Sequence, residues 1–129
     1  IHRSIFDNYG IFDENLSVCE DYDMWLRISS KEKIYFLKDQ LVIKHGGHND
    51  QLSKQYWGMD RFRVYSIEKS LKLNEFSKEQ KNIAIKHLLE KLQILINGSK
   101  KRNNSKVFEK YSKKFDFWNK INTDNLFND

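Results

Sequence analysis

The chain has 129 residues, of which 32% are charged and 14% aromatic, so it is long enough and apolar enough to bury the core of one domain. The aromatic content excludes a disordered composition, no apolar run approaches the length of a membrane span, and no signal-peptide pattern opens the sequence. The single cysteine, Cys19, excludes an internal disulfide framework and is typical of a reducing compartment. We therefore expect a cytoplasmic protein.

The net charge of +5 is unevenly distributed along the chain. Residues 1–50 contain six Lys and Arg against nine Asp and Glu, whereas residues 51–129 contain seventeen against nine. This asymmetry indicates either an acidic site attached to a basic surface that meets anions, or simply the solvated faces of Lys-rich helices. The anion could be nucleic acid, anionic lipid or a phosphorylated ligand.

Two helices are predicted before residue 31. The first covers His2–Tyr9 and ends at Gly10, because glycine readily adopts the left-handed conformation that stops a helix. The second covers Cys19–Ser30 and has three acids in its first turns, where the helix dipole favours negative charge. Helical spacing predicts that one face of this second helix is buried. That face consists of Tyr22, Trp25, Leu26 and Ser29.

Two short strands are predicted over Ile34–Leu37 and Leu41–Ile43, which are rich in β-branched and aromatic residues. Gly46-Gly47 then marks a loop. Because an isolated two-stranded ribbon is marginal in water, the strands need neighbours that this chain does not supply. The sequence thus predicts that part of the domain lies outside the chain, and a start at Ile1 rather than Met fits a fragment.

Three helices are predicted in the second part, so we divide the chain into residues 1–53 and residues 54–129. The middle helix begins with a capping box at Ser77–Gln80 and should end at Asn97-Gly98, before the basic linker Lys100–Asn104. Each helix has an apolar stripe at helical spacing. The stripes are Leu52, Tyr56, Met59, Phe62, Val64, Ile67 and Leu71; then Ile85, Leu88, Leu89, Leu92, Leu95 and Ile96; then Phe108, Tyr111, Phe115 and Trp118.

The densest acidic cluster is Glu20-Asp21-Tyr22-Asp23. At a helix start the dipole stabilises ionised acids, and an ionised Asp can take the proton from a hydroxyl nucleophile. The competing interpretation is an acidic turn that only caps its helix. Asp21 and Asp23 also spell D-x-D, a metal–diphosphate pattern, but residues i and i+2 of a helix point about 200° apart, so both cannot ligate one ion there. The same charges should raise the pKa of Cys19 and make it a poor nucleophile.

Two histidines, His45 and His48, flank the glycine pair. They could form a metal site, although their spacing alone is a weak signal and a loop histidine is more often a surface residue. Gly46-Gly47 lacks the Lys-Ser/Thr continuation of a phosphate-binding loop.

Three elements then follow in a fixed order and spacing. They are His2-Arg3-Ser4-Ile5-Phe6 with Tyr9-Gly10 and Phe12-Asp13-Glu14-Asn15-Leu16; Glu20-Asp21-Tyr22-Asp23-Met24-Trp25-Leu26-Arg27-Ile28; and the strand pair that leads to His48. They resemble the second half of family 2 glycosyltransferases of the GT-A type, with its "R-x-x-F…G-x-F-D-E-x-L", "E-D-x-D-L-W-L-R" and "L…x-L-V-x-Y-R-x-H" patterns. The resemblance covers residues 1–53, and the helical tail is not a general feature of the family.

The resemblance implies an α/β fold, namely the C-terminal part of a GT-A fold with short strands plus helices, followed by a three-helix α tail. It implies transfer of a sugar from a nucleotide-sugar donor to an acceptor hydroxyl, in surface glycan or polysaccharide synthesis. The matching base of inverting members is Asp21, and Glu20 would bind the acceptor. His48, followed by Ser53, would approach the metal or the donor diphosphate.

Three further residues would support the catalytic helix. Trp25 would do so by core packing, and Arg27 and Asp23 by forming an i,i+4 ion pair. The resemblance also implies a divalent metal, Mn²⁺ or Mg²⁺, and a glycan or lipid-linked acceptor. The nucleotide-binding strands and D-x-D of the family lie upstream of the "R-x-x-F" element, where this chain has no residues. We therefore expect the chain alone to be inactive and to bind nucleotide-sugars weakly.

Other functions compete with sugar transfer. The basic helices with interleaved aromatics, Trp57, Arg61, Phe62, Arg63 and Tyr65, could form a binding module for nucleic acid or an anionic membrane without catalysis. No helix-turn-helix, zinc or RNA-binding signature supports nucleic acid as the partner. Peripheral contact with the inner face of the membrane through the basic tail is compatible with a transferase. The third alternative is a structural domain without activity.

Overall fold

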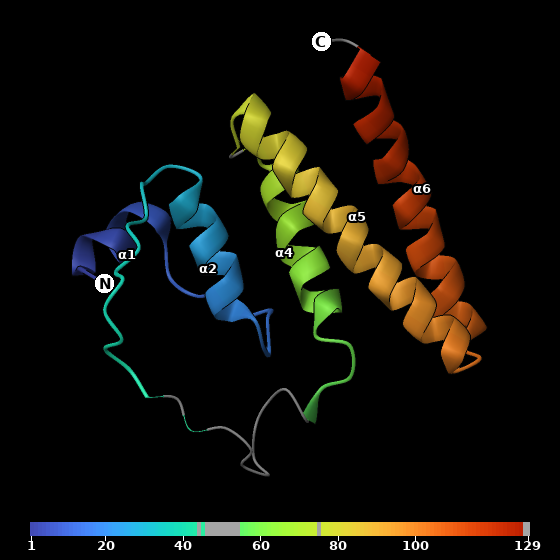
Figure 1. Cartoon of the computed structure of the whole chain (residues 1–129), viewed down its shortest axis with the longest axis horizontal. Coiled ribbons are helices and arrows are strands. Elements are labelled where there is room, and N and C mark those ends of the chain that lie inside the picture. The colour runs from blue at the N-terminus through green and yellow to red at the C-terminus, as the bar shows by residue number, and fades with distance from the viewer. Residues whose placement is uncertain (44, 46–54, 75, 128–129) are drawn as a thin grey trace.

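In the computed structural model, the described residues (1–43, 45, 55–74 and 76–127) contain five α-helices and no strand (Figure 1). The helices are α1 (Arg3–Tyr9), α2 (Glu20–Ser29), α4 (Asp60–Lys72), α5 (Lys78–Lys101) and α6 (Ser105–Phe127). Helices that follow one another along the chain pack side by side, with α1 against α2, α2 against α4, α4 against α5, and α5 against α6.

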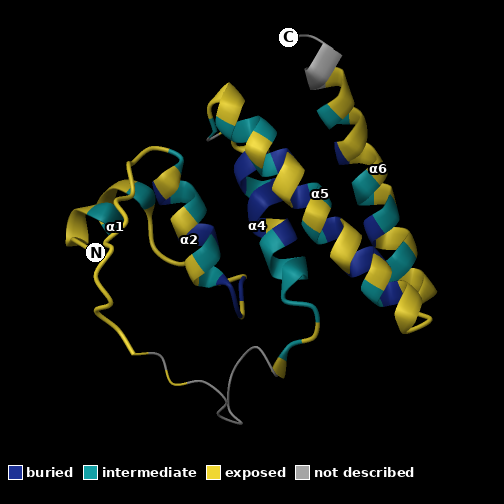
Figure 2. Ribbon diagram, in the orientation of Figure 1, coloured by how far each residue is buried: buried dark blue, intermediate teal, exposed yellow. Residues whose placement is uncertain are grey.

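The main core lies where α4, α5 and α6 face one another, and Figure 2 marks the buried residues of these helices in dark blue. Tyr22 and Leu26 of α2 pack against the same cluster, so the first part of the chain shares a core with the tail. The buried members of the cluster are Val64, Ile67, Leu71, Ile85, Leu88, Leu92, Leu95, Ile96, Tyr111 and Trp118.

Helix α5 begins as its sequence predicts. Ser77 Oγ accepts a hydrogen bond from the Gln80 amide at 3.3 Å, and Gln80 Oε1 accepts one from the Ser77 amide at 2.9 Å, which completes the capping box. The predicted end at Asn97-Gly98 is wrong, because α5 continues to Lys101. A glycine inside a helix costs about 1 kcal/mol relative to alanine, and the packing of the last turns of α5 on α6 offsets that cost.

Helix α6 contacts α4 as well as α5. Trp118 Nε1 donates a hydrogen bond to Glu68 Oε1 at 3.0 Å, and Lys114 forms an ion pair with Glu68, which is itself buried. The predicted aromatic face is confirmed, since Tyr111 and Trp118 are buried and Phe108 and Phe115 pack against the core. Although α5 and α6 are long, no helix in the described part of the chain combines the length and the hydropathy needed to cross a membrane.

Helix α1 ends at Gly10, as predicted, but with φ of 76° and ψ of 172° this glycine has a positive φ without the left-handed helical conformation. The buried face of α2 differs from the prediction. It consists of Asp23, Met24 and Ile28, whereas Trp25 is 44% exposed. The predicted face is therefore wrong, because Trp25 and Ser29 are exposed and Tyr22 and Leu26 are only half-buried.

The α/β fold class is wrong, because the described residues are all-helical. Ile34–Leu37 and Leu41–Ile43 form no strand, and their side chains are exposed, from 59% for Ile34 to 88% for Phe36. Strand-forming side chains become a sheet only when a second and third backbone supply hydrogen bonds and a face to bury. No described segment does so here, and the GT-A architecture is therefore not the fold of this part of the chain.

The exposed apolar run leads to a first prediction. A double substitution, Tyr35→Ser with Phe36→Ser, should reduce concentration-dependent self-association, because exposed segments of high β propensity pair readily between molecules. It should change the free energy of unfolding by less than about 0.5 kcal/mol, as surface substitutions do. Sedimentation velocity and urea unfolding measure the two effects.

The matched control is Ile85→Ser in the core, which should cost several kcal/mol, roughly 3 or more, by leaving a cavity and an unpaired hydroxyl. A comparable loss of stability in the Tyr35/Phe36 variant would contradict the exposed placement of this segment.

Candidate functional site

The first candidate site is built around a carboxylate buried between α2 and α4. Asp23 is fully buried, and two cations contact it. Arg27 Nε donates a hydrogen bond to Asp23 Oδ2 at 3.1 Å from one turn along α2, which confirms the predicted i,i+4 pair. Lys69 Nζ of α4 lies 2.7 Å from Asp23 Oδ1, as a charge contact rather than an aligned hydrogen bond. Such pairing is needed because an isolated buried carboxylate is strongly unfavourable.

Arg27 extends this ion-pair network to the chain that leaves α1. Its guanidinium donates to the carbonyl oxygen of Tyr9 and, at 2.8 Å, to that of Ile11. Gly10 lies between these two carbonyls, and a Cβ added there would lie 3.4 Å from Arg27 Nη1 on a backbone with φ of 76°. Glycine therefore permits both the turn and the close approach of the guanidinium.

Lys69 extends the network to the loop before α2. Its ammonium donates to Asp13 Oδ2 at 2.8 Å, and Asp13 Oδ1 accepts from the Asn15 amide at 3.0 Å. These hydrogen bonds, the one from Lys69 first, lower the pKa of Asp13 from 3.8 to about 2. Burial lowers the pKa of Lys69, but its bonds to Asp13 and Asp23 outweigh that effect, so the net shift is upward.

The proposed base, Asp21, and its neighbour Glu20 lie in the first turn of α2. Asp21 is exposed and Glu20 is half-buried, whereas Asp23 faces inward. The structure thus confirms that the two carboxylates of the D-x-D sequence point to different sides of the helix. Asp21 Oδ1 accepts from the Tyr22 amide at 2.7 Å, and no cation pairs with Asp21 within the described ranges.

Cys19 turns the chain into α2. Its φ of 62° is a left-handed conformation that is uncommon for a residue with a side chain, and its Sγ lies 4.0 Å from the Met59 carbonyl oxygen. α2 and α4 therefore begin at the same end of the molecule (Figure 1). Burial, and then the charges of Asp21 and Glu20, raise the pKa of the Cys19 thiol, which agrees with its predicted lack of reactivity.

Of the remaining predicted site residues, the structure describes Trp25 and His45. The assignment of Trp25 to core packing is wrong, because nearly half of its surface is exposed. His45 is exposed, and His48, Gly46-Gly47 and Ser53 lie outside the described residues. In the part of the chain that is described, no group of three His, Cys, Asp or Glu side chains could hold a metal ion.

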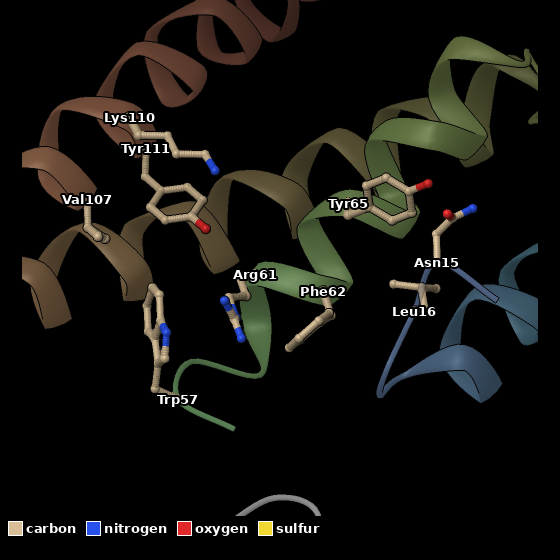
Figure 3. Close-up of a pocket in the computed structure, with 9 residues that line it drawn as sticks. All are labelled: Asn15, Leu16, Trp57, Arg61, Phe62, Tyr65, Val107, Lys110 and Tyr111. Atoms are coloured by element: carbon tan, nitrogen blue, oxygen red, sulfur yellow. The ribbon is translucent and has the colours of Figure 1, made fainter. Parts of the chain in front are cut away.

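A second candidate site is a groove of about 320 Å³ between α4, α6 and the loop before α2 (Figure 3). Four of its residues, Trp57, Arg61, Phe62 and Tyr65, belong to the binding surface predicted from the sequence, whereas no sequence pattern indicated the residues that α6 contributes. Arg63, the fifth residue singled out, points elsewhere and pairs with Asp60 at 2.8 Å. The groove is lined by Asn15, Leu16, Trp57, Arg61, Phe62, Tyr65, Val107, Lys110 and Tyr111.

Comparison with protein-family models, with curated proteins and with solved structures returns no match for this chain. The resemblance of residues 1–53 to family 2 glycosyltransferases therefore stays a prediction. The described residues offer two candidate functional sites, the exposed acid of α2 and the aromatic groove beside α4.

The ion-pair network leads to a second prediction. Asp23→Asn should lower the free energy of unfolding by about 3 kcal/mol, because Arg27 and Lys69 lose the charge that compensates them. Asp21→Asn, two residues away on the solvent side of the same helix, is the matched control and should cost less than about 1 kcal/mol. Urea unfolding followed by circular dichroism compares the two. Equal losses would contradict the inward placement of Asp23.

The pKa of Asp13 leads to a third prediction. Since its folded-state pKa of about 2 lies below the ordinary 3.8, this carboxylate contributes stability that is present above about pH 4 and is lost as the pH falls toward 2. The difference in melting temperature between wild type and Asp13→Asn should therefore shrink over that interval. Lys69→Gln should weaken this pH dependence, because Lys69 is the main cause of the shift. A difference that stays constant with pH would contradict the assignment.

Proposed function

We propose that this chain carries the acceptor-activating part of a glycosyltransferase, in which Asp21 removes the proton of an acceptor hydroxyl. The observation that carries the proposal is the division of roles between two acids in one turn of α2. Asp23 is buried and engaged by Arg27 and Lys69, whereas Asp21 is exposed and has no cation partner in the described part of the chain. A general base must reach the hydroxyl whose proton it takes, and the exposed position of Asp21 supports this role.

The surroundings of Asp21 support this role by fixing its position. The positive end of the α2 dipole favours the ionised form of a carboxylate in the first turn. The buried side chain of Val18 and the left-handed turn at Cys19 hold the chain that enters the helix, and the network around Asp23 holds the helix against α4. A base held in a fixed orientation contributes more to the rate than a mobile one.

The proposed reaction is a displacement at the anomeric carbon of a nucleotide-sugar. Asp21 accepts the hydroxyl proton as the acceptor oxygen forms its bond to that carbon. The bond from the carbon to the diphosphate breaks, and the nucleoside diphosphate leaves with the electron pair. Glu20, the adjacent residue in the chain, would orient the acceptor by accepting hydrogen bonds from its other hydroxyl groups.

The described residues do not provide the ligands of a divalent metal, since Asp23 is already occupied by two cations. No step above therefore runs through Mn²⁺ or Mg²⁺, and the metal and the contribution of His48 remain proposals for parts of the enzyme beyond the described residues. We also propose a cytoplasmic location. The buried free thiol of Cys19 supports it, because the cytoplasm keeps thiols reduced.

The fourth prediction tests the base. In the natural polypeptide that carries this sequence, Asp21→Asn should lower kcat by roughly 10²- to 10⁴-fold, the usual contribution of general-base catalysis, while donor binding is retained. Release of nucleoside diphosphate from a panel of UDP-, GDP- and dTDP-sugars, with cellular glycans and glycolipids as acceptors, measures turnover.

The matched control is Asp7→Asn, an exposed acid on α1 that should leave turnover unchanged. Near-normal turnover in the Asp21→Asn protein would remove Asp21 from its proposed role. No release of diphosphate from any donor by the wild type would remove the proposed activity.

A further inference from the structure

The groove beside α4 combines exposed aromatic rings with two cations that have no acidic partner among the described residues. We propose that it is a binding site for a sugar phosphate, with the sugar ring on the aromatic side chains and the phosphate on Arg61 and Lys110. The proposal does not depend on Asp21 acting as a base, because it rests on the lining of the groove alone.

Two aromatic side chains form walls that are open to solvent. Trp57 is 49% exposed and Tyr65 is 43% exposed, and both line the groove together with the buried ring of Tyr111 (Figure 3). Rings of this size are usually covered, because each buries a large apolar area. A pyranose ring presents a face of C–H groups that packs on such rings, while its hydroxyl groups stay in water. The walls therefore fit a sugar ring.

The cations of the groove lack acidic partners. The Arg61 guanidinium carbon lies 4.7 Å from the centre of the Trp57 ring and 4.4 Å from that of Phe62, so the group is held between the two rings. Its Nε is buried without a hydrogen-bond acceptor. Lys110 lies over the ring of Tyr111 at 5.6 Å, and no Asp or Glu lines the groove.

Neighbouring cations outside the groove have acidic partners. Arg63, two residues from Arg61 and on another side of α4, pairs with Asp60, and Lys114 of α6 pairs with Glu68. Within the described ranges, Arg61 and Lys110 have aromatic contacts only. An anion in the groove would supply their missing charge, and the planar fork of arginine donates two parallel hydrogen bonds to a phosphate.

The size of the groove favours a small ligand over a macromolecule. Its volume of about 320 Å³ is near the lower limit of small-molecule sites, and the polar lining is confined to a few groups. A duplex or a flat membrane would need a continuous basic surface rather than a hollow between two helices. The sugar phosphate could be a free metabolite or the headgroup of a glycerophospholipid such as phosphatidylinositol, and the two sources share the chemistry that the groove recognises.

The fifth prediction tests the groove by binding. Glucose 1-phosphate, N-acetylglucosamine 1-phosphate, the neutral sugars and inorganic phosphate are titrated into the full chain by isothermal calorimetry. At least one sugar phosphate should bind more tightly than its neutral sugar and than phosphate. Arg61→Gln and Lys110→Gln should each weaken that binding by about tenfold, the loss of a charge-assisted hydrogen bond. Trp57→Leu should weaken it while leaving the affinity for inorganic phosphate unchanged.

The matched controls are Arg3→Gln on α1 and Lys86→Gln on α5, which remove the same charges from exposed positions outside the groove and should not change the affinity. Phosphatidylcholine vesicles with and without phosphatidylinositol separate the two sources. Vesicle binding that requires phosphatidylinositol and is lost with Arg61→Gln identifies a lipid headgroup. The proposal is overturned if no probe binds, if phosphate alone binds as tightly as the sugar phosphates, or if the control variants lose as much affinity as the groove variants.

Discussion

The arrangement of the described chain depends on one buried charge, the carboxylate of Asp23. An ionised acid in the interior is tolerated only when cations and hydrogen bonds replace its water, and here Arg27 and Lys69 do so. Each cation also binds a second segment. Arg27 donates hydrogen bonds to the carbonyl oxygens on both sides of Gly10, and Lys69 donates one to Asp13 in the loop before α2. The pairing of one side chain thereby joins α2, two points of the segment between α1 and α2, and helix α4.

The same helix α4 separates two surfaces of opposite chemistry. On its α2 side it supplies Lys69 and holds the helix that presents Asp21 to solvent. On its α6 side it supplies Arg61 to a groove without acids. The acidic first turn of α2 and the groove lined by Arg61 and Lys110 thus share one supporting helix.

Residues 34–43 explain why the fold class was predicted wrongly. Their side chains have strand-forming chemistry, and sequence reasoning assigned them to a sheet on that basis. The helices bury their own apolar stripes against one another, so the folded core forms without these residues and leaves Phe36 and Val42 more than four-fifths exposed. A β propensity describes a side chain that suits a pleated surface, but the strand itself requires a partner backbone.

The sequence by itself determined the features that depend on contacts within one or two helical turns. These are the stop of α1 at Gly10, the capping box of α5, the stripes of α5 and α6, and the pairing of Asp23 with Arg27. Only the tertiary structure decided that Lys69 pairs with Asp13, 56 residues away, and that Arg61 of α4 lines one groove with Lys110 and Tyr111 of α6. It also decided that Asp23, rather than Trp25, occupies the inner face of α2. Periodicity identifies which residues share a face, whereas the neighbour of that face is set by how whole helices pack, and no local pattern encodes that choice.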